Sequence, residues 1–201
     1  MESNPSSADL GSPRDLEKRL QRVPPGDTVR GYFFRSPLEQ VRLTGNPEAL
    51  QRCLEIRGKE VPTAFFKYPI TALLQLLYHA AWALEAPRGF EESLRYLGQR
   101  VAQDFLENAV GKAMLLAGGK NLKLLANNLP AAYRTGWDHG HGAVKWTRPQ
   151  QCLVSIHDNV IPHPYFEGIF LQVFQAAGAK HLRVKGWQVE LTHTEYELSW
   201  V

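Results

Sequence analysis

The C-terminal stretch from Tyr165 to Val201 constrains the fold most, because one helix pattern is followed there by two strand patterns. Residues 165–177 predict an amphipathic helix, and Gly178 supplies the flexible backbone with which many helices end. Residues 182–190 and 195–201 then alternate apolar and polar side chains, as half-buried strands do. The end of the chain therefore predicts two strands that close a sheet beside a helix.

The rest of the chain divides into an early strand, a run of helices and two further strands. Residues 28–34 predict the first strand. Start signals such as Ser36-Pro37 and Asn46-Pro47 open a series of helices, predicted over residues 36–43, 47–57, 69–84, 90–107, 111–116 and 122–133. Residues 143–147 and 151–157 predict two strands. This order indicates the α+β class: an N-terminal strand and a helical layer packed on a mainly antiparallel sheet, with a C-terminal β-β-α-β-β unit.

Composition predicts how the chain is divided and where it works. Residues 1–26 are rich in Ser, Pro and charge and predict a flexible tail, followed by a single α+β domain over residues 27–201. Cys53 and Cys152 are far apart in the sequence. No apolar run reaches the length of about 18 residues that spans a bilayer, and the N-terminus has no signal-peptide pattern. We therefore expect a cytoplasmic protein without a membrane span. A net charge of +3 with scattered Lys and Arg does not favour nucleic-acid binding.

Several short stretches together carry a family resemblance that covers nearly the whole predicted domain. They are Val29-Arg30-Gly31, Tyr68-Pro69, Leu97-Gly98-Gln99-Arg100, Gly111, the segment from Leu129-Pro130 to Thr135-Gly136, and the C-terminal unit from Tyr165 to Trp200. With these stretches the chain resembles a family of uncharacterised proteins found mainly in myxobacteria, where it occurs as many paralogues. That family is more distantly similar to the vinyl-four-reductase domain, the bacterial heme nitric-oxide-binding domain and subunits of the TRAPP vesicle-tethering complex.

The resemblance implies a bacterial signalling or binding module with several helices beside an antiparallel sheet. Two departures limit what it implies about cofactors. The C-terminal cysteine cluster common in vinyl-four-reductase domains is missing, since the last cysteine is Cys152, and the Tyr-x-Ser-x-Arg signature of heme nitric-oxide-binding domains does not occur. We therefore expect no cofactor.

An aromatic cluster around the start of the apolar helix 69–84 is the candidate ligand site. Its members are Phe65, Phe66, Tyr68, Tyr78 and Trp82. Such side chains can line an apolar cavity between helices and sheet, the usual setting of a small-molecule site. They can equally form a packed core, and sequence does not separate the two.

A second candidate is the segment Trp137-Asp138-His139-Gly140-His141-Gly142. His139 and His141, joined by His157 if the two strands pair as a hairpin, could bind a divalent transition metal. Their spacing matches no standard zinc signature, and a glycine-rich turn that enters a strand explains the same residues.

The sequence contains no constellation typical of an enzyme, so three functions stay open. The first is a non-enzymatic regulatory module of a signalling system that binds a protein partner or a second copy of itself as a homodimer. The second is a sensor that holds a small apolar ligand in a cavity between helices and sheet. The third, a metal-dependent enzyme, depends on the three histidines.

Overall fold

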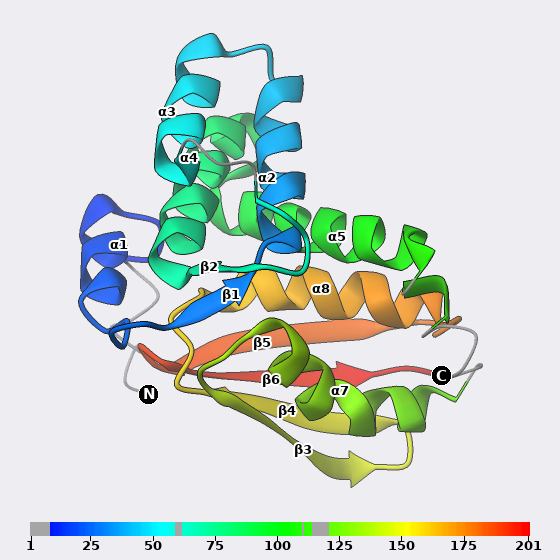
Figure 1. The fold of residues 1–201 in the computed structure, drawn as a ribbon. Coiled ribbons are helices and arrows are strands. Elements are labelled where there is room, and N and C mark those ends of the chain that lie inside the picture. Colours follow the sequence, from blue (N-terminus) through cyan, green and yellow to red (C-terminus); the bar gives the residue numbers. More distant parts are fainter. Residues whose placement is uncertain (1–8, 59–61, 110, 114–120) are drawn as a thin grey trace.

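A four-stranded antiparallel sheet forms one side of the molecule in the computed structural model, which describes residues 9–58, 62–109, 111–113 and 121–201 (Figure 1). Its strand order is β3-β4-β6-β5, and the bounds are His141–Arg148 for β3, Gln151–His157 for β4, Arg183–Glu190 for β5 and His193–Ser199 for β6. Cys152, Val154 and Ile156 on β4 are buried, whereas the residues between them are half-buried. The alternation arises because successive side chains of a strand point to opposite faces, and only one face carries helices.

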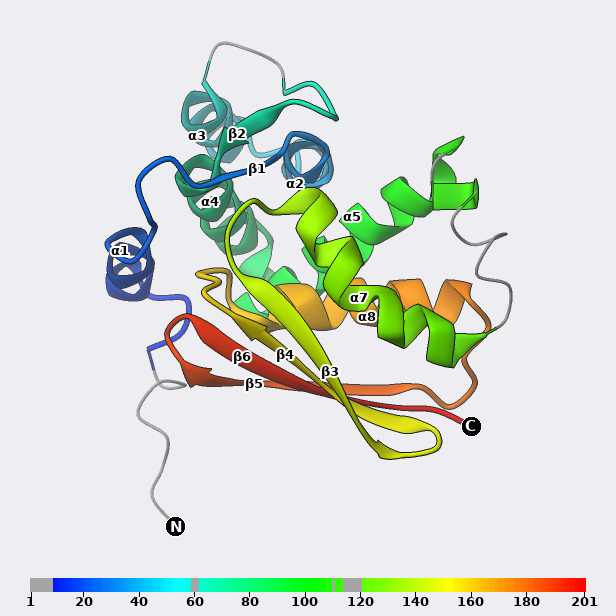
Figure 2. The same cartoon turned by 60° about the horizontal axis from the view of Figure 1, so that its bottom comes forward.

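The helices lie on one face of this sheet in two layers (Figures 1 and 2). Next to the sheet are α7 (Leu122–Gly136) and α8 (His163–Ala176), and α5 (Phe90–Glu107) packs against α8. The outer layer holds α2 (Tyr32–Leu43), α3 (Pro47–Arg57) and α4 (Ile70–Arg88). A short antiparallel pair, β1 (Thr28–Arg30) and β2 (Lys67–Pro69), connects this layer to the end of α7 through a bridge between Val29 and Trp137.

The predicted α+β architecture is confirmed, including the C-terminal β-β-α-β-β unit. Asn46 caps α3 by accepting hydrogen bonds from the backbone of Glu48 and Ala49, and Gly58 ends that helix at a positive φ. Of the helix predicted over residues 111–116, only residues 111–113 are among the described residues.

One predicted boundary is wrong. The first strand ends at Arg30 rather than Phe34, and α2 already begins at Tyr32, so that Pro37 lies inside the helix instead of opening it. Helical spacing buries Phe33, Phe34, Leu38 and Val41 together in the core. The free energy gained by burying this stripe outweighs two costs: the preference of the aromatic residues for strands, and the loss of the helical hydrogen bond that Pro37 cannot donate.

The segment predicted as a flexible tail contains the helix α1 (Pro13–Leu20), which packs against α4; residues 1–8 lie outside the described residues. Arg19 is 1% exposed and donates hydrogen bonds to Asp15, to the carbonyl of Val160 and to the side chain of Gln188. The hydroxyl of Tyr78 donates to the same Asp15. These buried polar contacts order residues whose composition is poor in apolar side chains, which is why composition did not predict them.

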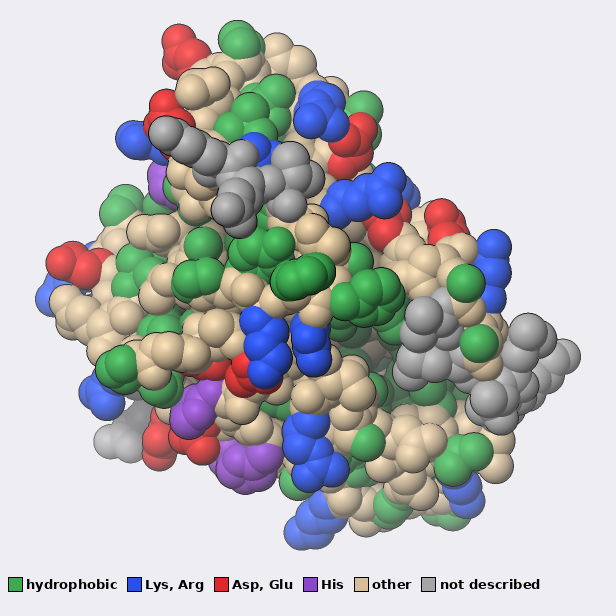
Figure 3. Space-filling view, in the orientation of Figure 1, with side chains coloured by type: hydrophobic (Ala, Val, Ile, Leu, Met, Phe, Trp, Pro, Cys, Tyr) green, Lys and Arg blue, Asp and Glu red, His purple; other side chains and the backbone are tan. Residues whose placement is uncertain are grey.

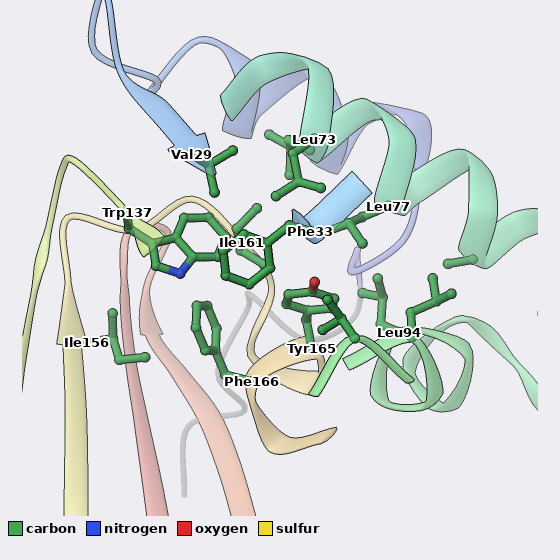
Figure 4. Packing of buried hydrophobic residues seen from close by; sticks show 14 of the residues in the cluster. Val29, Phe33, Leu73, Leu77, Leu94, Trp137, Ile156, Ile161, Tyr165 and Phe166 are labelled. Atoms are coloured by element: carbon green, nitrogen blue, oxygen red, sulfur yellow. The ribbon is translucent and has the colours of Figure 1, made fainter. Parts of the chain in front are cut away.

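A continuous hydrophobic core connects the layers. In Figure 4, Phe33 from α2, Trp137 from the end of α7 and Phe166 from α8 point toward one another. The ring centroid of Trp137 lies 4.8 Å from that of Phe33 and 5.5 Å from that of Phe166. Among the described residues, no helix combines the length and apolarity that a membrane crossing requires.

Candidate functional site

A cavity of about 400 Å³ lies between α5, α7, α8 and the sheet, within the size range of small-molecule sites. Each helix contributes a stripe of residues that repeats with the helical period. The described lining residues are Tyr32, Phe33, Val101, Ala102, Phe105, Leu106, Leu124, Leu125, Asn128, Leu129, Pro130, Ala132, Tyr133, Thr135, Trp137, Gly142, Val154, Ile156, Phe166, Ile169, Phe170 and Val173. The surface is almost wholly apolar, so it fits hydrocarbon or aromatic groups better than charged ones.

Aromatic rings form one wall of this cavity. Tyr133 and Trp137, one helical turn apart at the end of α7, stack with 11° between their planes and 5.9 Å between their centroids. Tyr32 extends this aromatic set: its ring lies 4.1 Å from that of Phe33, which packs on Trp137, and 5.4 Å from that of Phe105. Rings in these arrangements are rigid and offer both faces and edges to a bound molecule.

The polar side-chain groups of the described lining are three hydroxyls, one amide and the indole N–H of Trp137. The hydroxyl of Tyr133 donates to the carbonyl of His139 at 3.2 Å. Burial raises the pKa of both Tyr32 and Tyr133, and the carboxylates of Asp27 and Asp158 raise that of Tyr133 further. Both tyrosines therefore stay neutral. Among the lining residues that the structure describes, none is His, Cys, Asp, Glu, Lys or Arg.

The cavity opens toward solvent along α7. Three of its lining residues on this helix are exposed, namely Leu124, Asn128 and Thr135, whereas Val154, Phe166 and Phe170 are buried. The lining thus combines an exposed rim on α7 with buried apolar side chains from β4 and α8.

The aromatic cluster predicted from sequence lies elsewhere and is divided by the fold. Tyr78 and Trp82 come together with ring centroids 5.8 Å apart, where the Trp82 indole donates to the carbonyl of Gly11 at 2.7 Å. Tyr68 packs on Phe34 instead, and Phe65 and Phe66 are 66% and 67% exposed. None of the five belongs to the lining of the described cavity. A ligand site at these residues stays a prediction.

The predicted hairpin does bring two of the metal-site candidates together. His141 on β3 stacks on His157 on β4 with 4.9 Å between ring centroids, and His157 stacks on His193 at 3.9 Å. Burial, followed by repulsion from His193 and His141, lowers the pKa of His157. Stacked imidazole rings face each other with their flat sides, so their nitrogen lone pairs do not point at one common position where a metal ion could bind. The described part of the chain contains no group of three His, Cys, Asp or Glu residues placed to hold a metal ion, and His139 contributes its carbonyl to Tyr133.

One alternative that the sequence predicts is a cavity between helices and sheet, but that prediction assigns the lining to other residues. The helical repeat of Leu125, Leu129 and Ala132, and that of Val101 and Phe105, marks the sides of α7 and α5 that turn inward. A helix that packs against its neighbours without a gap shows the same repeat. The volume of the cavity depends instead on how far apart the three helix faces lie in space.

The fold itself has solved counterparts among H-NOX domains. The chain superposes on the Fe(II) unliganded H-NOX protein from K. algicida with a TM-score of 0.65 and 13% sequence identity, over 86% of this chain and 96% of that one. A mutant of the T. Tengcongensis H-NOX gives a TM-score of 0.62 and 11% identity, over 85% of this chain and 97% of that one. At such low identities the likeness shows a shared H-NOX-like fold.

By sequence, the chain belongs to a family described as "protein of unknown function (DUF2378)", whose profile matches residues 22–201. No protein with a curated description is similar enough in sequence to match.

Proposed function

We propose that this chain is a sensor domain that holds a small, largely apolar organic molecule in the cavity between α5, α7, α8 and the sheet. The observation that carries the proposal is the cavity itself: about 400 Å³, lined by apolar and aromatic side chains, with an exposed rim on α7. The described lining has hydroxyl groups but no His, Cys, Asp, Glu, Lys or Arg that would activate them or bind a metal, so we assign no reaction to the site.

The H-NOX structures raise the question of heme, because the K. algicida protein is described as Fe(II) unliganded and another solved structure concerns heme distortion in the H-NOX family. Protein ligands of heme iron are imidazole, thiolate, thioether or tyrosinate groups. The described cavity lining contains none of the first three, and burial raises the pKa of Tyr32 and Tyr133, which opposes formation of a tyrosinate. The lining residues that the structure describes do not fit a heme, so we propose a metal-free ligand.

A titration with the uncharged fluorophore N-phenyl-1-naphthylamine tests the proposal, because its emission rises in apolar surroundings. Ala132 lines the cavity, whereas its neighbour Ala131 is exposed and does not. We expect saturable binding to the wild type, a loss of affinity of about tenfold or more in Ala132→Trp, and unchanged binding in Ala131→Trp. The two variants add the same side chain to adjacent positions of α7, so general effects of tryptophan cancel.

Unchanged probe affinity in a folded Ala132→Trp variant would show that the probe binds elsewhere. An absence of saturable binding to the wild type, together with a native mass spectrum of the bare polypeptide, would remove the support for a ligand. Circular dichroism of both variants checks that each retains the fold.

The second candidate function is a cytoplasmic regulatory module that binds a protein partner or a second copy of itself. The exposed side chains of Phe65 and Phe66 favour it, since large exposed apolar groups often mark interaction surfaces. Light scattering coupled to size-exclusion chromatography tests the homodimer, which would give twice the mass of 22.7 kDa.

A further inference from the structure

Two adjacent phenylalanines protrude from a loop whose backbone is held in place. The loop 63–66 precedes β2, and its side chains of Phe65 and Phe66 are 66% and 67% exposed. The backbone of Gly31 donates to the carbonyl of Phe66 at 2.9 Å, and that of Tyr32 donates to the carbonyl of Ala64 at 3.1 Å. The exposed rings therefore stand on a fixed support rather than on a free loop.

Gly31 allows this support to form. A Cβ atom at this position would lie 2.3 Å from the carbonyl oxygen of Thr63, well inside contact distance. The hydroxyl of Tyr68 adds a further tie by accepting a hydrogen bond from the backbone of Thr63 at 2.9 Å. Because the backbone is already ordered, little further conformational entropy is lost when the two rings bind to something.

Cationic residues adjoin this loop, either as neighbours in the chain or through hydrogen bonds to its backbone. Arg30 donates a hydrogen bond to the carbonyl of Phe65 at 2.6 Å and another to the carbonyl of Thr135. Lys67 directly follows Phe66, and the exposed Arg134 directly precedes Thr135 in the chain. Asp138, which pairs with Lys67 at 2.8 Å, offsets one of these charges. Figure 3 shows Lys and Arg side chains directly below hydrophobic ones in the middle of this face. Exposed aromatic rings beside Arg and Lys are suited to the interface of an anionic bilayer.

The loop also adjoins the rim of the cavity. Arg30 links the Phe65 carbonyl to the carbonyl of Thr135, and Thr135 lines the cavity at its exposed side. Tyr32, whose backbone holds the loop, lines the cavity as well. A surface that contacted the two rings would thus lie next to the entrance of the ligand site.

We propose that Phe65 and Phe66 insert into the headgroup region of an anionic membrane, with Arg30, Lys67 and Arg134 facing the lipid phosphates. Membrane docking would place the cavity rim beside the phase into which apolar ligands partition. The purpose of docking rests on the proposed function, whereas docking itself does not, because it requires only the exposed loop and its charges.

Cosedimentation with vesicles tests the docking. The full chain is mixed with vesicles of phosphatidylglycerol and phosphatidylcholine, or of phosphatidylcholine alone, and the bound fraction is measured. We expect binding to the anionic vesicles that weakens as salt is added. The double variant Phe65→Ser/Phe66→Ser should bind at least about tenfold more weakly, because each buried ring contributes a large apolar surface. Arg134→Gln should bind about fivefold more weakly.

Matched controls come from other parts of the surface. Leu43, at the far end of α2, is 70% exposed, so Leu43→Ser removes a similarly exposed apolar side chain. Arg183→Gln removes an exposed cation from β5. Both should bind anionic vesicles as the wild type does.

Two outcomes would overturn the docking proposal. If the wild type does not bind anionic vesicles, the proposal fails, and a protein partner becomes the better explanation of the exposed rings. If the double variant cosediments with anionic vesicles as strongly as the wild type does, the rings are not inserted. Titration of the same double variant with N-phenyl-1-naphthylamine, without vesicles, keeps the two proposals apart: we expect unchanged affinity there, whatever happens to vesicle binding.

Discussion

At the scale of single residues, two glycines determine how closely α5 approaches α8. A Cβ on Gly98 would lie 1.9 Å from the carbonyl oxygen of Tyr165, and a Cβ on Gly168 would lie 1.9 Å from that of Arg95. Neither oxygen belongs to a flexible side chain that could turn away. The crossing therefore brings backbone against backbone, and it fixes the separation of two helices that line the cavity.

Gly98→Ala tests this crossing. In an isolated helix the substitution would stabilise by about 1 kcal/mol, since alanine is the better helix former. Here we expect the free energy of unfolding to fall by about 2 kcal/mol or more, because α5 and α8 must move apart. Denaturant unfolding measures the change. A variant as stable as the wild type would show that the crossing has room for a methyl group.

Gly142→Ala is the control for that measurement. Its Cβ would lie 3.4 Å from the Cα of Pro130, an ordinary contact, so the free energy of unfolding should change by less than about 0.5 kcal/mol.

At the scale of elements, α1 shows how a polar segment can be held on a fold. The ion pair of Arg19 with Asp15 has a nitrogen–oxygen distance of 3.0 Å, and both side chains are buried. Arg19 also reaches the carbonyl of Val160, far along the chain. A charge in this position is costly unless every partner is present, so the pair specifies where α1 packs.

Arg19→Ala should destabilise the protein by about 3–5 kcal/mol, because Asp15 would remain buried without its cation. Lys18→Ala is the matched control on the same helix. Lys18 pairs with Asp9 at 2.8 Å, but both side chains are substantially exposed, so its loss should cost at most about 1 kcal/mol. Thermal unfolding of the two variants compares them, and equal melting temperatures would mean that α1 contributes little to the fold.

At the scale of the whole molecule, the sequence predicted what depends on local pattern and missed what depends on distant contacts. The alternation in β4 and the apolar repeat in α5 directly encode which face is buried, so class and order of elements could be predicted. The hydrogen bond from Arg30 to Thr135 and the ion pair of α1 join residues whose partners no spacing reveals. The cavity belongs to the same group, since its volume depends on how far apart three apolar faces lie.

One buried imidazole makes a defined contribution to the pH dependence of global stability. His163 opens α8, and its Nδ1 atom is buried without a hydrogen-bond partner. Burial, then repulsion from Arg19 and Arg95, lowers the pKa of His163 to about 4. In the unfolded chain its pKa is about 6.5. Between these values the unfolded chain binds the proton and the folded protein does not, so stability falls as the pH falls.

This difference predicts a loss of at most roughly 2 kcal/mol between pH 7 and pH 5 from His163 alone. His163→Gln removes the titration, so its free energy of unfolding should vary less over that interval than that of the wild type. His139→Gln, at an exposed position, should leave the wild-type slope unchanged. Urea unfolding at several pH values separates the cases. Parallel curves for His163→Gln and the wild type would mean that His163 takes up its proton equally well in the folded state, and hence that its surroundings open to water.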